Sequence, residues 1–388
     1  MPRFASALSQ PGLGAVAEFK RRSPSMGDIR PAARVEDVVR LYAANGASAI
    51  SVLVDEQFAG TVDDLRAARA VTDVPLLAKG FFSTEEHVRE LKEAGADAVL
   101  LILRDLDDAA TRRLLDYAHE LGLDALVEAH DAGELQRAMA LDAPVIGINA
   151  RDLSTFEIDL RGQLELVAQA PRDRIVIAES GVHTRAQGAA AELAGADAVL
   201  VGTSLMQAAD PGAKLRELLS RPLVKVCGLT RQEDVDAAID AGADLLGFIH
   251  VDASPRRSDV VLDVPETHIA VSVFVEETRE TPADLIQFYP ERGEAGVRGR
   301  EAMLLRDGVR VGTLLDQPWQ QHDALHWSRA AAAKGRIVLA GGLGPENVRD
   351  AIAAVSPWAV DAASSLESSP GVKDHARVRA YVEAARSA

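Results

Sequence analysis

The stretch EEHVRELKEAGADAVLLI, residues 85–102, contains one complete helix-to-strand joint. Its first ten residues alternate charged and apolar side chains at the spacing of an amphipathic helix. Gly95 follows at the position where a helix end favours glycine, and the apolar run AVLLI comes directly after it. Short apolar runs that alternate with amphipathic helices are typical of parallel strands buried on both faces. The stretch therefore predicts an α/β fold.

The same joint recurs along the chain, at GASAISVL (46–53), GADAVLVG (195–202) and GADLLGFI (242–249). Within the first 220 residues, successive apolar runs end 21 to 33 residues apart, and no GxGxxG motif follows the first of them. This spacing favours a (β/α)8 TIM-type barrel over an open nucleotide-binding sheet. The eight predicted strands are 15–20, 49–53, 75–79, 98–102, 125–128, 145–149, 174–180 and 198–202.

Composition limits the possible functions. A chain of 388 residues suggests two domains, and its formal charge of -17 makes nucleic acid an improbable partner. No run of eighteen apolar residues and no signal-like N-terminus occur, so we expect no membrane association and a cytoplasmic location. A single cysteine and the lack of clustered Cys or His at metal-ligand spacing predict no internal disulfide and no metal site.

Charged residues close several of the apolar strands, although only seven of the 42 basic residues are lysines. A lone charge at a strand end is more often a solvated rim residue, but agreement among several strands favours a site. The carboxyl ends of barrel strands converge on the active site, and paired lysines and glutamates there suit acid–base chemistry. The candidates are Glu18, Lys20, Lys79, Glu128, Asn149, Arg151, Glu179 and Ser180, with glycines near 181 and 202 for a phosphate.

The first part of the chain resembles indole-3-glycerol-phosphate synthase over residues 4–219. The motifs that carry the resemblance are AEFKRRSPSMGDI (17–29), SVLVDEQFAGT (51–61), LVEAHD (126–131), GINARDL (147–153), AESGV (178–182) and LVGTSLM (200–206). The resemblance implies closure of the indole ring of 1-(2-carboxyphenylamino)-1-deoxyribulose 5-phosphate with loss of carbon dioxide and water. It also implies that no cofactor takes part.

The resemblance assigns a role to each candidate. Lys79 would be the general acid, Lys20 would hold the substrate carboxylate, and Glu128 would handle the proton of dehydration with support from Glu18 and Asn149. The remaining residues would bind substrate (Arg151, Glu179, Ser180) or its phosphate (Gly181, Gly202, Thr203). Two departures from the family, Gly80 in place of aspartate and a short lead before the first strand, predict weaker substrate binding.

The second part resembles phosphoribosylanthranilate isomerase over residues 223–385. The motifs are VKVCGLTRQEDVDAAIDAGADLLGFIHVDASPRRS (224–258), LLDQPW (314–319), VLAGGLGPENV (338–348) and VDAASSLESSPGVKD (360–374). The resemblance implies an Amadori rearrangement with Cys227 as general base, Asp316 as general acid and Arg256 on the anthranilate. Gly341, Gly342 and Ser364 would bind phosphate. Ser365 replaces a family glycine, which predicts strain in its loop. A thiolate base also requires nearby cations that lower its pKa.

We expect domains at 1–221 and 222–388, the second a shortened (β/α)8 barrel. From the strand ending at Val275 to Asp316 only 41 residues must hold three strand-to-strand steps, which would need 63 at the minimum spacing of the first barrel. Placing the fourth strand at 285–288 or at 296–299 does not remove the deficit. The spacing therefore predicts fewer than eight regular βα units, an open barrel and weak isomerase activity.

Three classes of function stay open at this point. The first is a bifunctional tryptophan-biosynthesis enzyme acting on small phosphorylated anthranilate-derived substrates, with other enzymes of the pathway as candidate partners. The second is a synthase whose C-terminal barrel is a non-catalytic structural or interaction domain. The third is a Schiff-base aldolase, which borohydride trapping of an imine would reveal.

Overall fold

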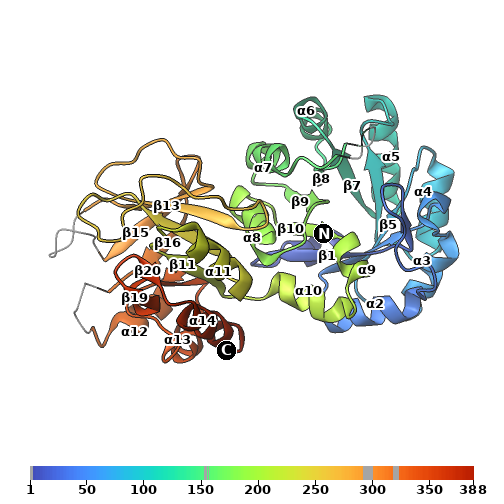
Figure 1. Ribbon diagram of the computed structural model, residues 1–388. Coiled ribbons are helices and arrows are strands. Elements are labelled where there is room, and N and C mark those ends of the chain that lie inside the picture. Colours follow the sequence, from blue (N-terminus) through green and yellow to red (C-terminus); the bar gives the residue numbers. More distant parts are fainter. Residues whose placement is uncertain (1–2, 153–154, 156, 292–299, 318–322) are drawn as a thin grey trace. The chain divides into compact units, whose positions relative to one another are not determined.

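The computed structural model describes every residue except 1–2, 153–154, 156, 292–299 and 318–322. The chain forms two compact units, shown in Figure 1. Unit 1 comprises residues 1–183 and 188–219, and unit 2 comprises residues 184–187 and 220–388. The predicted domain boundary between residues 221 and 222 stays a prediction. It implies that residues 1–221 fold independently, which expression of that fragment would test.

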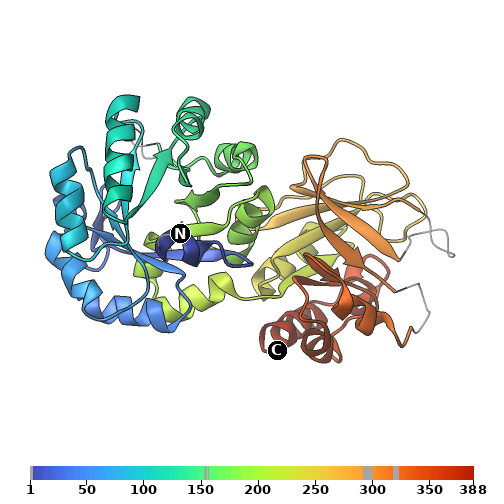
Figure 2. The ribbon, with the colours of Figure 1, turned by 180° about the vertical axis from the view of Figure 1, so that it is seen from behind.

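Unit 1 contains a closed barrel of eight strands, all parallel, as the sequence predicts. Figure 2 shows from behind how helices surround this ring. The strands are β1 (Gly14–Phe19), β4 (Ala49–Leu53), β5 (Leu76–Lys79), β6 (Ala98–Ile102), β7 (Asp124–Ala129), β8 (Val145–Asn149), β9 (Ile175–Glu179) and β10 (Ala198–Val201).

Five helices of unit 1, α3 to α7, begin at side-chain caps that the sequence supplies. Thr61 and Asp64 form a capping box at the first turn of α3, and Asp107 accepts a backbone N–H at the start of α5. The helices are α1 (Arg3–Leu8), α2 (Val35–Ala44), α3 (Val62–Arg69), α4 (Glu85–Glu93), α5 (Asp108–Glu120), α6 (Ala132–Ala140), α7 (Leu160–Gln169), α8 (Arg185–Ala194), α9 (Thr203–Gln207), α10 (Pro211–Leu219) and the short 3-10 turn η1 (Glu56–Phe58). A two-residue hairpin, β2 (Arg22–Ser23) with β3 (Gly27–Asp28), follows β1.

Apolar side chains fill unit 1 in two layers. The outer layer lies between the strands and the surrounding helices. The inner layer fills the barrel, where Val16, Leu77 and Leu126 pack with Phe4 and Leu8 of α1. The backbone N–H of Ala5 donates to the carboxylate of Asp124, the first residue of β7, at 2.9 Å. Helix α1 therefore covers the amino ends of the strands and leaves their carboxyl ends open for a site.

Unit 2 also contains a closed barrel of eight strands, so the expected open barrel is wrong. One strand, β15, runs antiparallel to both of its neighbours, β14 and β16. The strands are β11 (Leu223–Cys227), β12 (Leu245–Ile249), β13 (Ile269–Val275), β14 (Leu285–Tyr289), β15 (Glu301–Arg306), β16 (Val309–Leu315), β17 (Ile337–Leu339) and β18 (Ala359–Ala362). The fourth strand lies at the first predicted place, and the alternative at 296–299 falls outside the described residues.

The expectation of fewer than eight regular βα units is confirmed. Among the described residues of unit 2, α-helices occur only after β11, β16, β17 and β18, and β15 and β16 are joined by a tight turn at Asp307 and Gly308. These helices are α11 (Gln232–Ala241), α12 (His326–Ala332), α13 (Val348–Val355) and α14 (His375–Arg386). The 3-10 turn η2 (Ser364–Leu366) and the hairpin β19 (Glu367–Ser369) with β20 (Val372–Lys373) precede α14.

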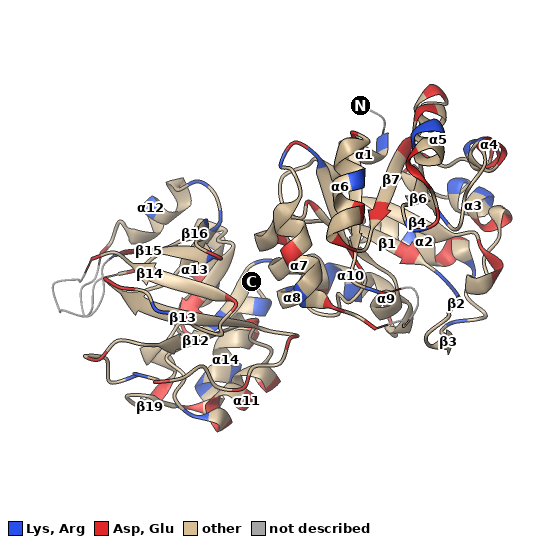
Figure 3. Ribbon diagram, turned by 90° about the horizontal axis from the view of Figure 1, so that it is seen from above, with Lys and Arg blue, Asp and Glu red and all other residues tan. Residues whose placement is uncertain are grey.

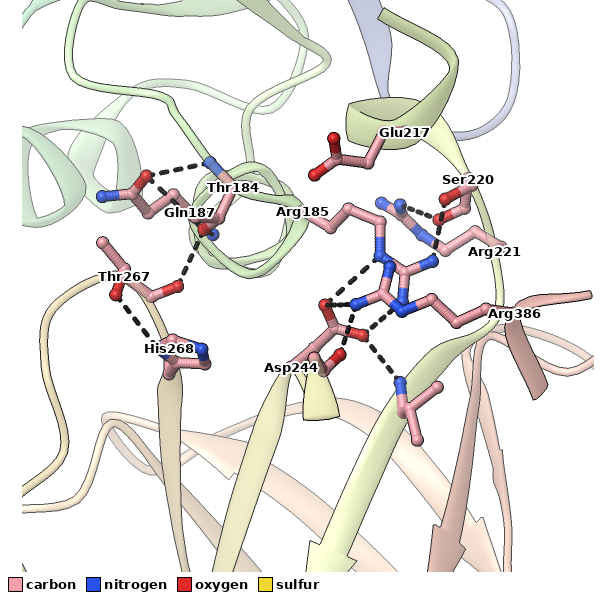
Figure 4. A network of polar contacts seen from close by, with 12 residues as sticks. Thr184, Arg185, Gln187, Glu217, Ser220, Arg221, Asp244, Thr267, His268 and Arg386 are labelled. Carbon is pink, nitrogen blue, oxygen red and sulfur yellow. Dashed lines mark hydrogen bonds and ion pairs between the residues drawn. The ribbon is translucent and has the colours of Figure 1, made fainter. Parts of the chain in front are cut away.

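A buried polar cluster in unit 2 fixes the start of β12 (Figure 4). The carboxylate of Asp244 forms an ion pair with Arg185, whose Nη1 donates to the Ser220 hydroxyl at 2.8 Å. The same carboxylate accepts the backbone N–H of Val224 at 2.8 Å and lies 3.3 Å from Arg386. These donors compensate the burial of the Asp244 charge.

Surface charges of both signs alternate along the outer helices, as α3 and α4 show in Figure 3. In the part of the chain that the structure describes, no helix combines the length and apolarity needed to cross a membrane.

Candidate active site

Four strand ends of unit 1 place one lysine among three glutamates. The Nζ atom of Lys79, at the end of β5, forms an ion pair with Glu179 at the end of β9. It also lies 3.6 Å from Oε2 of Glu128 and 3.7 Å from Oε2 of Glu18. All three carboxylates are buried, and the Lys79 side chain is 13% exposed. Lys79 and Glu179 end their strands, Glu18 and Glu128 lie one residue before the ends of theirs, and the barrel brings the four together.

The other predicted residues lie around this cluster. Lys20 Nζ donates to Oε1 of Glu18 at 2.7 Å. The side-chain oxygen of Asn149, at the end of β8, accepts the backbone N–H of Arg151 at 3.0 Å. The Arg151 guanidinium reaches the hydroxyl of Ser25 at 3.3 Å. Asn149 thus shapes the turn that carries Arg151 to the mouth of the barrel.

The surroundings of Lys79 keep its ammonium charged. Burial alone would lower the pKa of Lys79, but the adjacent carboxylates of Glu179, Glu128 and Glu18 outweigh burial and raise it above its ordinary value. A lysine that forms a Schiff base must be available as the neutral amine, which requires a lowered pKa. The electrostatics at Lys79 therefore suit a general acid and disfavour the aldolase alternative.

The two most buried carboxyl groups, those of Glu128 and Glu179, have opposite properties. Burial opposes ionisation of Glu128, but Lys79 and His130 outweigh it and lower its pKa. Burial raises the pKa of Glu179 to about 8, and the charge of Glu128 adds to this effect. The two lysines at this mouth can compensate the charges of only two of the three glutamates. The third glutamate, Glu179, therefore retains its proton near neutral pH. The site thus holds an ionised base and a protonated acid side by side.

Two glycines make room for these carboxyl groups. A Cβ atom at Gly147 in β8 would lie 2.0 Å from Oε1 of Glu179. A Cβ atom at Gly202 would lie 2.3 Å from Oε1 of Glu18. Neither distance is possible for real atoms, so any larger residue at these positions would displace a carboxylate.

A cavity of about 340 Å³ opens above the cluster. Its apolar rim includes Met26, Phe81 and Ile158, which are unusually exposed for large apolar side chains. Ser180 and Gly181 both have positive φ, 68° and 75°, and line the same cavity. Of the residues predicted for this site, the cavity is lined by Glu18, Lys20, Lys79, Glu128, Asn149, Arg151, Ser180, Gly181, Gly202 and Thr203, whereas Glu179 lies buried beneath it.

Sequence reasoning missed His130, two residues after Glu128. Its Nε2 lies 3.1 Å from Oε1 of Glu128 and its Nδ1 lies 3.0 Å from Oε2 of Glu134. Burial alone would lower the pKa of His130, but the two carboxylates raise it overall. The motif LVEAHD (126–131) could have indicated His130, because Glu128 and His130 are two residues apart and alternate residues of a strand share a face.

In unit 2, Cys227 lies buried at the end of β11. Arg256 packs over the adjacent Gly228, and its Nε lies 2.8 Å from Oε1 of Glu367. Burial raises the pKa of the Cys227 thiol, and the nearby charge of Lys225 offsets this only in part. The condition for a thiolate base, nearby cations that lower the thiol pKa, is therefore not met by the residues around Cys227.

The remaining predicted residues of unit 2 lie in the loops that follow its strands. Asp316 follows β16, and Gly341 and Gly342 follow β17, both with positive φ. A Cβ atom at Gly341 would lie 2.4 Å from the backbone N of Gln317, so Gly341 lets the loop approach the residue after Asp316. Ser364 opens η2 after β18.

The expected strain at Ser365 is wrong. Ser365 is not among the described non-glycine residues with positive φ, and its hydroxyl donates to the carbonyl of Leu343.

A buried polar group that sequence reasoning missed lies inside the second barrel. Lys225, two residues before Cys227 on β11, contacts Asp361 of β18 at 3.0 Å and Gln287 of β14 at 2.8 Å. Burial alone would lower the pKa of Lys225, but Asp361 and Cys227 raise it. The Oδ1 atom of Asp361 is buried with no hydrogen-bond partner among the described residues.

Comparison with known proteins gives the following matches. A family model described as "Indole-3-glycerol phosphate synthase" matches residues 2–218, and one described as "N-(5'phosphoribosyl)anthranilate (PRA) isomerase" matches residues 301–384. The "Tryptophan biosynthesis protein TrpCF" of Yersinia pestis is 35% identical over 405 residues, which cover 96% of this chain and 84% of that protein. The "Indole-3-glycerol phosphate synthase" of Nocardioides sp. is 46% identical over 219 residues, 56% of this chain and 83% of that protein. The crystal structure of TrpF from Jonesia denitrificans shares 30% identity, with a TM-score of 0.34 over 43% of this chain and 97% of that one.

Proposed function

Because the chain belongs to the family of bifunctional tryptophan-biosynthesis proteins that join an indole-3-glycerol phosphate synthase to a phosphoribosylanthranilate isomerase, we propose specific roles for the residues of its two barrels. Unit 2 converts phosphoribosylanthranilate to 1-(2-carboxyphenylamino)-1-deoxyribulose 5-phosphate. Unit 1 closes the indole ring of that product, releasing carbon dioxide and water to give indole-3-glycerol phosphate.

In ring closure, the aryl carbon that bears the carboxylate attacks the C2′ carbonyl of the ribulose chain. Lys79 donates a proton to the carbonyl oxygen as the carbon–carbon bond forms, since an ammonium beside a developing alkoxide stabilises it. Lys20 holds the substrate carboxylate until it leaves as carbon dioxide. The contacts of Lys79 with three carboxylates are the observation that carries this assignment, because they keep it protonated.

In dehydration, the new hydroxyl leaves as water while a proton is removed from the ring system. Glu128 accepts that proton, since its pKa is lowered and it is ionised at neutral pH. Glu18 and Asn149 hold Lys20 and Arg151, their hydrogen-bonded neighbours, in place. Glu179, Arg151 and Ser180 bind substrate, and the backbone around Gly181, Gly202 and Thr203 takes the phosphate.

In the isomerase reaction, Asp316 protonates the ring oxygen of the ribose as its bond to C1′ breaks. Cys227 removes the C2′ proton from the resulting iminium ion, which gives the enolamine that tautomerises to the ketose. Arg256 binds the anthranilate carboxylate, and Gly341, Gly342 and Ser364 bind phosphate. A substrate cation at C1′ favours the thiolate, which offsets the effect of burial on Cys227.

The test is an assay of the purified chain with each substrate in turn, together with two variants. Lys79→Met should abolish ring closure and leave isomerisation intact, whereas Cys227→Ala should do the reverse. A parent chain that closes the ring but does not consume phosphoribosylanthranilate would support the non-catalytic reading of unit 2. Loss of both activities in either variant would contradict the separate roles. A cytoplasmic location and contacts with other enzymes of the pathway stay predictions outside this test.

A further inference from the structure

A chain of hydrogen bonds crosses the interior of the second barrel and ends on Asp316. Lys225 Nζ donates to Oε1 of Gln287 at 2.8 Å, and Nε2 of Gln287 donates to the hydroxyl oxygen of Tyr289 at 3.0 Å. The Tyr289 hydroxyl then donates to Oδ2 of Asp316, also at 3.0 Å. Gln287 and Tyr289 lie two residues apart on β14, so they face the same side of the strand.

Every donor in this chain points the same way, from the ammonium of Lys225 toward the carboxylate of Asp316. Lys225, Gln287 and Tyr289 are each no more than 2% exposed, so water does not compete for these bonds. In such a setting, successive hydrogen bonds polarise one another, and the phenol becomes a stronger donor than it would be alone. The chain begins beside Cys227, because Lys225 lies on the same strand two residues earlier.

A general acid has to be held close to the atom that it protonates. Misplacement by about 1 Å can cost a factor of about 100 in rate. The terminal rotation of an aspartate is broad, so its carboxyl group requires a fixed partner to keep one orientation. The Tyr289 hydroxyl fixes one carboxyl oxygen of Asp316. It also stabilises the carboxylate that forms when the proton moves to the substrate.

We propose that Tyr289 is a positioning residue for Asp316, and that Gln287 ties this pair to Lys225 beside the general base. The proposal rests on the isomerase function of unit 2. One buried network would then orient both groups through which the proton moves, and Gln287 and Tyr289 would act through these groups.

The test compares Tyr289→Phe, which removes only the hydroxyl, with the parent chain. We expect the isomerase kcat to fall about 10- to 100-fold while KM for phosphoribosylanthranilate stays within about twofold. A KM near that of the parent shows that unit 2 is intact. Ring closure by unit 1, measured on the same sample, should not change. Gln287→Leu, which keeps the phenol but cuts its tie to Lys225, should lower kcat by a smaller factor.

The matched control is Tyr381→Phe, which removes another fully buried hydroxyl from unit 2. The Tyr381 hydroxyl has no hydrogen-bond partner among the described residues, so kcat should not change. A Tyr289→Phe variant with kcat within twofold of the parent, or with only KM altered, would overturn the role of Tyr289. Equal losses in Tyr289→Phe and Tyr381→Phe would overturn it as well. A parent chain with no isomerase turnover would overturn the proposed isomerase function together with this role.

Discussion

Replacing Lys79 by Met removes one ammonium from a mouth that holds three glutamates, and it leaves the length of the side chain nearly unchanged. Above about pH 8, where Glu179 is ionised, the carboxylates of Glu18, Glu128 and Glu179 then share a single cation, Lys20. Breaking a buried ion pair by removal of one partner typically costs about 3–5 kcal/mol. Because a domain of this size is stable by about 5–15 kcal/mol, we expect unit 1 to remain folded at 25 °C but to unfold at a lower urea concentration.

A second substitution separates this electrostatic cost from the loss of catalysis. Glu179→Gln in the Lys79→Met background removes one of the unpaired carboxylates while keeping its shape. We expect the double variant to regain most of the lost stability, since the two residues are in direct contact and their effects are not additive. It should regain none of the ring-closure activity, because no ammonium is restored. The quantity to be measured is the interaction free energy of the two substitutions, that is, the difference between the unfolding free energy lost in the double variant and the sum lost in the two single variants.

The pH dependence gives an independent check on Glu179. A carboxyl group whose pKa is raised in the folded chain binds its proton more tightly there than in the unfolded chain. Stability is therefore retained below the unfolded pKa of about 4.5 and lost as the pH rises through about 8, the value for folded Glu179. The single variant Glu179→Gln should lack this loss. The free energy of unfolding of Glu179→Gln, relative to that of the parent, should accordingly increase between pH 4.5 and 8.

Urea titrations can assign these effects to one unit. All three tryptophans, at 319, 327 and 358, lie in unit 2, so their fluorescence reports that unit alone, whereas far-UV circular dichroism reports both. Lys79→Met should shift the dichroism transition and leave the fluorescence transition in place. A Lys79→Met variant as stable as the parent at pH 8, or a double variant less stable than Lys79→Met, would refute the reasoning.

Three further predictions concern unit 1. Gly147→Ala should lower ring-closure activity at least tenfold, because the new Cβ displaces the Glu179 carboxyl group. In the control Gly188→Ala the new Cβ meets no atom closer than 3.4 Å, so activity should not change. Ring-closure assays on both variants test this. His130→Gln should cost most stability below pH 6.5 and progressively less as the pH rises through the raised pKa of His130, as urea titrations at a series of pH values would show. Residues 1–221 alone should give a folded, active synthase by dichroism and assay, and an insoluble fragment would contradict the predicted domain limits.

The first barrel could be predicted from sequence because its signals are local. Each strand is a short apolar run, a glycine precedes four of the strands (Gly46, Gly95, Gly122 and Gly195), and several residues at the strand ends face the site. Lys79 is an example: its place in the chain, directly after VPLLA, already predicts its place at the mouth. What could not be predicted is the protonation of its neighbours. That depends on distances among Glu18, Glu128 and Glu179, which lie on three different strands and are set only when the barrel closes.

The second barrel shows where spacing arguments fail. A strand-to-strand step needs a long crossover, at least 21 residues in the first barrel, only where the two strands are parallel. Beyond Tyr289, the chain instead forms β15 antiparallel to β14 and turns back into β16 through Asp307 and Gly308. An antiparallel step needs only a two-residue turn, so 41 residues suffice for three steps.

The chain reverses its direction twice, from β14 to β15 and from β15 to β16. These two reversals explain how Asp316 and Cys227 lie at the same end of the barrel although one strand is inverted. One reversal would bring the next strand in with its carboxyl end at the wrong mouth. The second reversal restores the direction, and β16 accordingly pairs in parallel with β17. Asp316, which follows β16, therefore lies at the same end of the barrel as Cys227, which ends β11. The hydrogen bond from Tyr289, at the end of β14, to Asp316 is possible for the same reason, because β14 and β16 run in the same direction on either side of β15. The inverted strand shortens the chain without moving the general acid away from the general base.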